Sequence, residues 1–285
     1  MNDHIYVLIP VFNAPSYTAL CLQSLLDIEH GAIIKPVIIN NASRQKVCDN
    51  IYTWATAFEL KTSTKPIIIN SDKNVGFAGA LNLGLESVSP NSYVCILHND
   101  TIVYPNWIVE MVKIFESADE DVAVVCPRTN YANEVHPCFP QIRTKFETLK
   151  LGNKDRPSVE QLKELIAQTY PDETLKNALD SVKFPGEYSP DISSFCMLTK
   201  SDIFAKYGKF DEDFWPRGFE DKFWFMKMER DGYICMIANK AYVHHWGNIS
   251  SDGPGFCFPD MMKQNEQKYK EKCAEIDRAG ISVDN

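Results

Sequence analysis

Residues 98–101 (His98, Asn99, Asp100 and Thr101) place an imidazole, an amide, a carboxylate and a hydroxyl directly after the apolar segment 93–97. Five adjacent apolar or aromatic residues are typical of a buried strand, so the polar cluster is expected at its carboxyl end, where open α/β sheets bind ligands. A lone carboxylate there suits Mg²⁺ or Mn²⁺, because a bound diphosphate supplies further oxygens. The alternative interpretation is a simple turn, since these residue types also favour turns.

Apolar segments of strand length alternate with helical patterns through the first 126 residues. Parallel strands are predicted at 5–9, 35–40, 66–70, 93–97 and 122–126. Helices with one apolar face are predicted around 21–26 and 108–115. This alternation predicts an α/β fold with a doubly wound, mostly parallel sheet.

Polar and glycine-containing segments follow four of these strands and would meet at one edge of the sheet. They are 10–13, 40–43, 74–79 and 98–100. Gly76 and Gly79 allow close approach of the backbone to a ligand or a neighbouring helix, and the next helix amino terminus offers N–H groups to an anion. The sequence therefore predicts a ligand cleft at this edge.

Composition excludes several classes of protein. The chain has 285 residues, is 45% hydrophobic and carries a net charge of −9, which fits a globular protein and argues against nonspecific binding to nucleic acid. The nine cysteines are an odd number and no two of them form a C-x-x-C motif. We therefore expect reduced thiols in the core rather than a disulfide framework. No segment predicts a membrane span or a secretory signal. We expect a cytoplasmic protein, with peripheral contact to a membrane left open.

The alternation stops near Thr129, and five prolines between 130 and 188 mark an insertion with one helix from 158 to 169. A strand at 195–199, a helix from 220 to 230 and strands at 233–237 and 241–245 follow. We predict one catalytic domain at 1–252, in which the insertion at 130–188 forms part of the acceptor side, and a tail at 253–285. The glycines and proline of 250–255 predict a loop that orders over the ligand.

Six short motifs stand in the chain in a family-specific order. They are PVFN, INNAS, NVGFAGALNLGL, LHNDT, GFEDKFW and VHHWGNIS. As a set they resemble family-two glycosyltransferases of the GT-A fold, and among these the rhamnosyltransferase-like branch. The resemblance covers about residues 5–126 and 190–251.

The resemblance implies a site for a nucleoside-diphosphate sugar. Pro10, Phe12 and Asn13 would frame the base and ribose, with Asn40 in place of the family's usual aspartate. Asn74, Gly76 and Asn82 would line the donor pocket, although Asn82 could also face solvent on its helix. His98 and Asn99 would belong to the same pocket, where the His98 imidazole could ligate the metal, point at a ribose hydroxyl or only pack.

The resemblance also implies the metal ligands and the catalytic base. Asp100 would bind Mn²⁺ or Mg²⁺. Because His244 and His245 are adjacent in a strand they point to opposite faces, so at most one reaches the ion, and the spacing to Gly247 favours His245. Glu220 and Asp221 begin a helix, and the family's aspartate at this position takes the proton of the acceptor hydroxyl. A helix start rich in acids is the alternative reading of this pair.

These residues together predict an inverting, metal-dependent glycosyltransferase of the hexosyltransferase type, with a UDP- or dTDP-sugar as donor. Two other functions stay open, a catalytically silent sugar-nucleotide or glycan-binding module and a nucleotidyltransferase, although 10–16 lacks a phosphate-gripping loop. The acceptor is expected to be a glycan, a lipid-linked sugar or another hydroxyl. A slight excess of basic residues over 141–163 is compatible with an anionic acceptor, of which modified DNA is the most weakly supported, but an ordinary solvated surface is the favoured interpretation of these charges.

Overall fold

The computed structural model describes residues 4–118, 121–130, 158–169, 172–189, 192–247 and 258–279. The predicted loop at 250–255 lies outside these residues. So do all the basic residues of 141–163 except Lys163.

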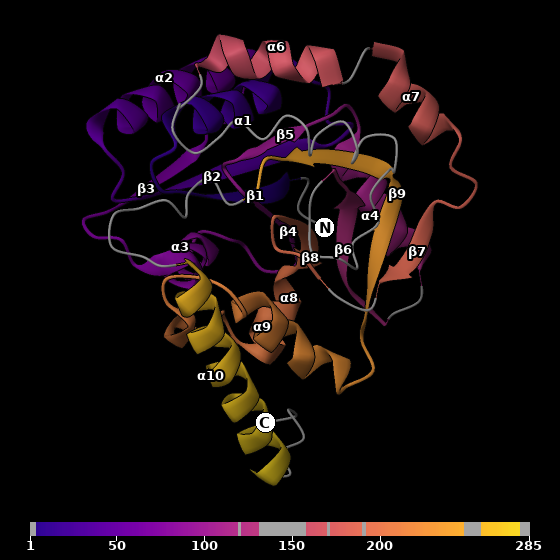
Figure 1. Cartoon of the computed structure of the whole chain (residues 1–285). Coiled ribbons are helices and arrows are strands. Elements are labelled where there is room, and N and C mark those ends of the chain that lie inside the picture. The colour runs from indigo at the N-terminus through magenta and orange to yellow at the C-terminus, as the bar shows by residue number, and fades with distance from the viewer. Residues whose placement is uncertain are drawn as a thin grey trace.

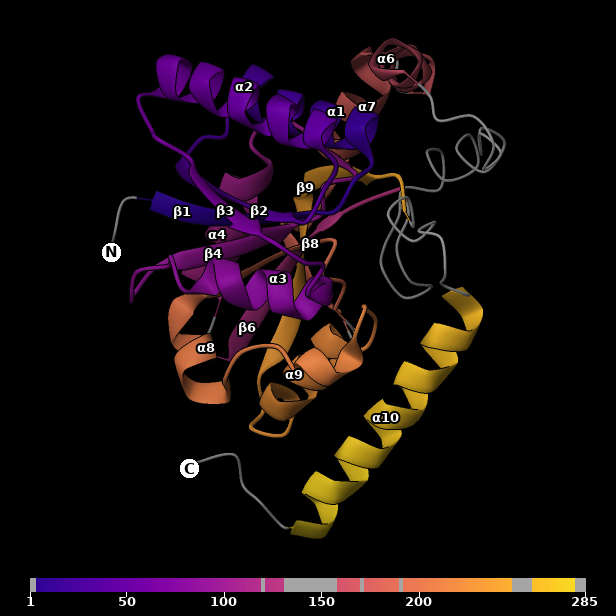
Figure 2. The same cartoon turned by 90° about the vertical axis from the view of Figure 1, so that its left-hand side faces the viewer.

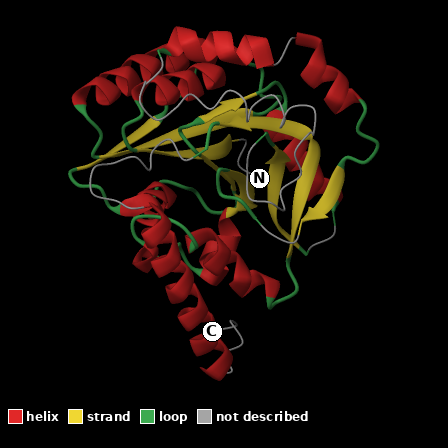
Figure 3. Ribbon diagram, viewed as in Figure 1, coloured by secondary structure: helices red, strands yellow, loops and turns green. Residues whose placement is uncertain are grey.

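A single large sheet carries the described part of the molecule (Figures 1 and 3). Its strands are β1 His4–Val11, β2 Ile33–Asn41, β3 Ile67–Ser71, β4 Tyr93–Leu97, β5 Thr101–Val103, β6 Val122–Arg128, β7 Gly186–Ser189, β8 Cys196–Lys200 and β9 Ile234–His245. Their order is β3-β2-β1-β4-β8-β6-β9-β5, with β7 paired to β9. The five strands predicted in the first 126 residues are all present.

Six of the nine described strands point in one direction. Parallel pairing joins β1 to β2 and β4, β2 to β3, and β6 to β9. The reversed strands are β8, which lies between β4 and β6, and β5 and β7, which both pair with β9. The prediction of a mostly parallel α/β sheet is therefore confirmed.

Helices cover both faces of the sheet (Figure 2). The described helices are α1 Pro15–Asp27, α2 Gln45–Thr62, α3 Gly76–Leu85, α4 Trp107–Ser117, α6 Val159–Thr169, α7 Asp172–Asp180, α8 Ser201–Tyr207, α9 Glu220–Glu229 and α10 Phe258–Ala279, with a 3₁₀ turn at Glu212–Phe214. Helices α1, α2 and α4 pack on one face, and α3, α8 and α9 on the other. Within the predicted insertion, Leu162 of α6 packs with Leu20 of α1.

Strand β1 shows why the sheet is buried on both sides. Ile5, Val7 and Ile9 belong to the core under α1 and α2, while Tyr6 and Leu8 belong to the core over α3. Successive side chains of a strand point to opposite faces, so a continuous apolar run is needed where both faces carry helices. Burial of this kind contributes roughly 1.5–3 kcal/mol for each large apolar side chain.

Strand β9 corrects one sequence prediction, because 233–237 and 241–245 form one continuous strand of 12 residues. Asn239 and Lys240 interrupt its apolar pattern, but Asn239 is only 3% exposed. Its Oδ1 accepts from Arg128 Nε at 2.9 Å and its Nδ2 donates to the Phe184 carbonyl at 3.1 Å. The amide is satisfied inside the protein, so the strand continues and curves across the sheet (Figure 1).

Helix α10 lies within the predicted tail and packs against α9. Tyr269, Cys273 and Ile276 contact the cluster of Phe214, Phe223 and Met226. None of the helices in the described ranges combines the length and the apolar character that crossing a bilayer requires.

His30 supplies a test of the packing between α1 and α4. Its Nε2 lies 2.9 Å from the Leu25 carbonyl, and its Nδ1 accepts from Trp107 Nε1 at 3.1 Å, which requires a neutral ring. Burial lowers the pKa of His30 below its ordinary value. The stability that the neutral ring contributes is therefore present above the unfolded-state pKa and is lost as the pH falls through the folded-state pKa.

We expect His30→Gln to reduce this pH dependence, because the amide can make both hydrogen bonds and does not titrate. Urea unfolding followed by circular dichroism between pH 8 and pH 5 measures it. Wild type should lose more unfolding free energy over this interval than the variant. Parallel curves would show that His30 does not titrate with unfolding.

Candidate active site

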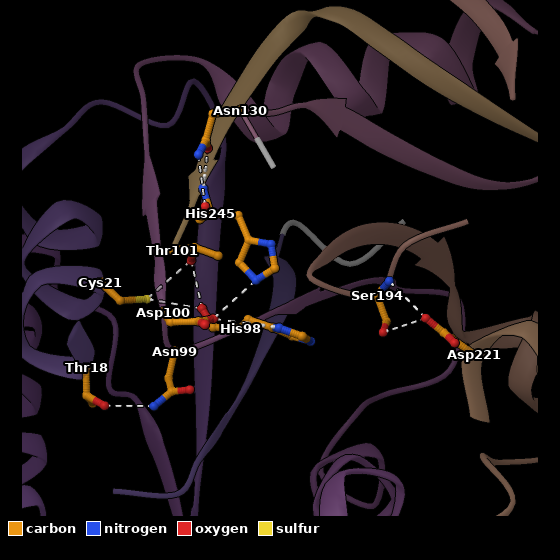
Figure 4. Close-up of polar contacts among 10 residues, drawn as sticks. All are labelled: Thr18, Cys21, His98, Asn99, Asp100, Thr101, Asn130, Ser194, Asp221 and His245. Carbon is orange, nitrogen blue, oxygen red and sulfur yellow. Dashed lines mark hydrogen bonds and ion pairs between the residues drawn. The ribbon is translucent and has the colours of Figure 1, made fainter. Parts of the chain in front are cut away.

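Three side chains from two segments meet beyond the carboxyl end of β4, two from the segment after β4 and one from the end of β9 (Figure 4). Asp100 Oδ1 lies 3.4 Å from His245 Nε2 and 3.7 Å from His98 Nδ1. One ligand atom from each residue lies within 4.8 Å of the others, so a single ion could contact all three. Asp100 is 3% exposed and His245 is 8% exposed.

The pairing of β5 with β9 selects which histidine joins this group. In that antiparallel pair Thr101 stands opposite His245 and Ile102 opposite His244. Because adjacent residues of a strand face opposite sides, His244 turns into the protein, where it is fully buried and packs edge-on against Trp246 at 4.7 Å. The structure thus brings His245, and not His244, to Asp100.

Burial and charge leave the group in the protonation state that a metal needs. Burial lowers the pKa of His98 to about 3, with His245 and Arg217 adding to the effect and Asp100 opposing it. Burial by itself would raise the pKa of Asp100, but His245, His98 and Arg217 bring it below its ordinary value. At neutral pH the site therefore offers a carboxylate and a neutral His98 imidazole, both competent ligands.

Backbone contacts hold the two ligand-bearing segments in place. The Asp100 carbonyl accepts from the Trp246 amide at 3.0 Å. Asn130 fastens His245, since its Nδ2 donates to the His245 carbonyl at 3.0 Å and its Oδ1 accepts from the His245 amide at 2.8 Å. Asn130 was not among the predicted site residues, although its position as a polar residue just beyond the buried strand β6 was a usable signal.

Two aromatic rings enclose the histidines. Phe195, 1% exposed, stacks on His245 with ring centroids 4.8 Å apart, and its carbonyl accepts from the His98 amide at 2.7 Å. Phe77 packs edge-on against His98 at 4.9 Å. Both rings were missed as site residues, because nothing in their local sequence separates them from ordinary core residues.

Glu220 and Asp221 begin α9 but lie in different environments. Glu220 is 3% exposed, and its Oε2 has no hydrogen-bond partner among the described residues. Burial and the neighbouring Asp221 raise the pKa of Glu220 to about 8. Asp221 is only half-buried, and its Oδ2 accepts from Ser194 Oγ at 2.7 Å and from the Ser194 amide at 3.2 Å.

Ser194 connects this carboxylate to the histidine group. It directly precedes Phe195, which contacts both His98 and His245. The pair Ser194–Asp221 lies beside the group in Figure 4. The sequence analysis missed Ser194, because the contact joins residues 27 positions apart and has no local pattern.

Hydrogen bonds of asparagine side chains join the loops predicted to bind the donor. Asn40 Nδ2 donates to Asn70 Oδ1 at 2.9 Å. Asn41 Nδ2 donates to Asn74 Oδ1 at 2.9 Å and to the Gly76 carbonyl at 3.1 Å. These bonds fix the ends of β2 and β3 and the start of α3 relative to one another.

Four further residues predicted on the donor side have varied surroundings. Pro10 lies in β1, whereas Phe12 and Asn13 directly follow this strand and are half-buried. The Asn13 amide donates to Ser43 Oγ at 3.0 Å. Asn99 is 5% exposed and donates to Thr18 Oγ1 at 2.8 Å, so its side chain points toward α1 in Figure 4.

Asn82 does not face solvent, contrary to one reading of its helix. It is 8% exposed, its Nδ2 donates to the Phe210 carbonyl and to Glu212 Oε1, both at 2.9 Å, and its Oδ1 accepts from the Phe210 amide at 3.0 Å. These three bonds fasten α3 to the segment that leads to α9. A donor-binding role for Asn82, and for Asn99, stays a prediction.

Comparison with known proteins decides the family. The sequence profile described as "Glycosyl transferase family 2" matches residues 6–172, which is more than half of the chain. The chain belongs to glycosyl transferase family 2. The family-level resemblance drawn from the motifs is therefore confirmed, while the rhamnosyltransferase-like branch stays a prediction.

Two curated relatives of this family-two chain come from Streptococcus pneumoniae serotype 4. The glycosyltransferase GlyG is 26% identical over 124 residues, and the glycosyltransferase GlyA is 25% identical over 127 residues. Each match covers 44% of this chain, but only 39% of GlyG and 17% of GlyA. The chain thus matches less than half of either relative.

Solved structures with a similar fold include two manganese complexes. The mannosyltransferase PcManGT from Pyrobaculum calidifontis, in complex with GDP-Man and Mn²⁺, has a TM-score of 0.60 at 15% identity, covering 95% of this chain and 64% of that one. GalNAc-T7 with UDP, GalNAc and Mn²⁺ has a TM-score of 0.59 at 13% identity, covering 94% and 48%. These likenesses confirm the GT-A fold of this family-two chain.

Glu220→Gln tests the environment of the carboxylate pair. Because the folded-state pKa of Glu220 is raised, the stability it contributes is fully present below about pH 4.5 and is lost as the pH rises through about 8. Relative to wild type, the Gln variant should therefore gain on the order of 2–4 kcal/mol of unfolding free energy between pH 5 and pH 9. Urea unfolding at the two pH values measures it.

The exposed Glu59 of α2 is the matched control. Glu59→Gln should change the unfolding free energy by less than about 0.5 kcal/mol at both pH values. If Glu220→Gln behaves like Glu59→Gln, the carboxyl of Glu220 is ionised in the folded protein and its environment is not the one described.

Proposed function

We propose that this chain is an inverting, metal-dependent glycosyltransferase that moves a hexose from a nucleoside-diphosphate sugar to an acceptor hydroxyl. The observation that carries the proposal is that one short segment contacts both the Asp221 carboxylate and the candidate metal ligands. Ser194 binds the Asp221 carboxylate, and the adjacent Phe195 contacts both histidines beside Asp100. The two adjacent residues Ser194 and Phe195 thus contact both the proposed proton acceptor, Asp221, and the candidate metal site.

The donor set of the metal site fits Mn²⁺ better than Mg²⁺. His98, Asp100 and His245 offer two imidazole nitrogens and one carboxylate oxygen. Mg²⁺ is bound almost entirely by oxygen ligands, whereas Mn²⁺ is a transition-metal ion that accepts imidazole nitrogen more readily, so two histidines favour Mn²⁺ between these two ions. An ion held there would neutralise the charge that develops on the departing diphosphate.

Asp221 is the proposed general base. It would accept the proton of the acceptor hydroxyl as the hydroxyl oxygen bonds to the anomeric carbon and the bond from that carbon to the phosphate oxygen breaks. The electron pair leaves with the nucleoside diphosphate, and a single displacement inverts the anomeric centre. The two bonds from Ser194 orient the carboxylate for this step.

We infer that the donor binds along the ends of β1 and β2 and the start of α3. Pro10, Phe12, Asn13 and Asn40 would meet the nucleoside, and Asn74 and Gly76 would lie beside the diphosphate. Our proposed donor is a UDP- or dTDP-sugar, as in the rhamnosyltransferase-like branch that the motifs resemble, while Asn40 offers the base an amide where a carboxylate is usual. A cytoplasmic location fits the free cysteines, of which Cys21, Cys95, Cys126, Cys196 and Cys235 are buried.

Metal and nucleotide should bind cooperatively. Three protein ligands leave coordination positions for phosphate oxygens, so Mn²⁺ should bind at least about tenfold more tightly in the presence of UDP or dTDP. Titration calorimetry with and without nucleotide measures the difference. Asp100→Asn should abolish the coupling, whereas Asp72→Asn, which changes an exposed carboxylate, should preserve it.

Two outcomes would contradict the metal site. One is an Mn²⁺ affinity that does not change when UDP or dTDP is added. The other is full sugar transfer in excess EDTA.

Asp221→Asn tests the base. Because the amide keeps the size of the side chain but cannot accept a proton, transfer should fall by roughly two to four powers of ten while UDP affinity stays within about twofold. Transfer from UDP-glucose, UDP-N-acetylglucosamine, GDP-mannose and a dTDP-sugar is assayed with acceptor pools, and nucleotide binding is measured separately. Near-normal turnover of Asp221→Asn would refute the assignment.

Glu220→Gln is the comparison, and it should lose less activity than Asp221→Asn. A larger loss at Glu220 would move the base by one residue and leave the glycosyltransferase proposal intact.

A further inference from the structure

Trp215 is an exposed aromatic side chain in the segment that leads into α9. It is 46% exposed, whereas the preceding Phe214 is fully buried. Among the five tryptophans it is the most accessible, since Trp54, Trp107 and Trp224 are at most 7% exposed and Trp246 is half-buried. Phe214 anchors this segment in the core, and Trp215 presents a large apolar surface beside it.

Contacts connect the segment of Trp215 to the proposed donor side and to the histidine group. Its Cδ1 lies 2.7 Å from the point where a Cβ on Gly76 would stand, so the indole lies against the backbone at the start of α3. The next residue, Pro216, accepts a hydrogen bond from the Phe77 amide at 2.8 Å. Phe77 in turn contacts His98, and Asp221 follows Trp215 by six residues.

Helix α10 makes this segment a fixed support. Asn265, 1% exposed, donates from Nδ2 to the carbonyls of Phe214 and Arg217, both at 2.9 Å. Met262 Sδ lies 2.7 Å from the position of a Cβ on Gly218. Trp215 is thus part of a loop held on both sides, which lowers the entropy cost of binding a ligand on its face.

We propose that the indole of Trp215 is a platform for the acceptor, and that the acceptor is a sugar ring rather than a phosphate-rich polymer. A pyranose has faces made of C–H groups and a rim of hydroxyls, so it can cover an aromatic surface while one rim hydroxyl points to a base. This inference rests on the proposed function and names its acceptor class.

The charges of the same segment favour a neutral acceptor. Asp211, Glu212 and Asp213 precede Trp215 by four to two residues, and Glu212 and Asp213 are exposed. Lys272 contacts Asp211 at 2.9 Å and Asp213 at 2.8 Å, so one lysine meets two carboxylates. Lys268 also lies beside Asp213, where it donates to the backbone carbonyl at 2.6 Å, and Arg217 follows Trp215 by two residues. Acidic and basic side chains are therefore balanced around Trp215, and a nucleic acid or a polyphosphate chain would meet no surplus of positive charge there.

Methyl glycosides of glucose, galactose, mannose and N-acetylglucosamine are the probes for this subsite. Saturation-transfer difference NMR in the presence of UDP and Mn²⁺ detects their binding, and sugar transfer to the same glycosides gives KM and kcat. We expect wild type to bind at least one glycoside. Trp215→Ala should lose its NMR signal and raise its KM about tenfold or more, because aromatic stacking and the buried area are both lost.

Two control variants distinguish the loss of aromatic stacking from a general loss of structure. Trp215→Phe keeps an aromatic face and should stay within about threefold of the wild-type KM. Leu60→Ala removes another exposed apolar side chain, on α2, and should leave both measurements unchanged. UDP affinity and donor hydrolysis without acceptor should stay within about twofold in Trp215→Ala.

Three results would overturn the platform. Trp215→Ala could keep the wild-type KM, it could lose UDP affinity in parallel with transfer, or wild type could transfer sugar only to acceptors that carry no sugar ring. Failure of the proposed function has a different signature, namely that wild type neither binds nucleotide with Mn²⁺ nor hydrolyses any donor. The glycoside NMR arm still reports on Trp215 in that case.

Discussion

The antiparallel pairing of β5 with the second half of β9 is the constraint on which the candidate site depends. It places His245 opposite Thr101, one residue from Asp100, and turns His244 into the core. The two histidines are adjacent in sequence and chemically identical, so only the register of the strand decides which one faces the carboxylate. A slip by one residue would exchange them and would also bury the wrong face of β9.

Asp100 and Glu220 are both buried carboxyl groups, but their surroundings shift their pKa values in opposite directions. Asp100 has two imidazoles and a guanidinium nearby, and its pKa lies below the ordinary value despite burial. Glu220 has an adjacent carboxylate instead, and burial raises its pKa to about 8. At neutral pH the first is charged and the second is mostly protonated. The neighbour of Asp221 at that pH is therefore a mostly neutral carboxyl group.

Much of the fold was predictable, because it rests on local patterns. The first five predicted strands of the sheet read as apolar runs, and polar residues at their ends predicted where a ligand would bind. The prediction failed at β9, where a polar pair suggested a break but Asn239 is satisfied by Arg128 and Phe184. Local sequence cannot show such a long-range bond.

The candidate site was predictable at the residues that stand in motifs, and not at those that support them. His98, Asp100 and His245 could be named from strand ends and alternation, and the structure brings them together. Ser194, Phe195 and Arg217 act through contacts with segments far away in the chain. Asn82 illustrates the same limit, since its three bonds to Phe210 and Glu212 span about 130 residues.

The hold of α10 on the segment before α9 has a consequence for the order in which the protein matures. During synthesis, all strands of the described sheet have left the ribosome before Asn265 does, so the sheet can form while Phe214 and Arg217 still lack their last backbone partner. The support of the segment that leads into α9 is therefore completed by a helix that is no part of the sheet.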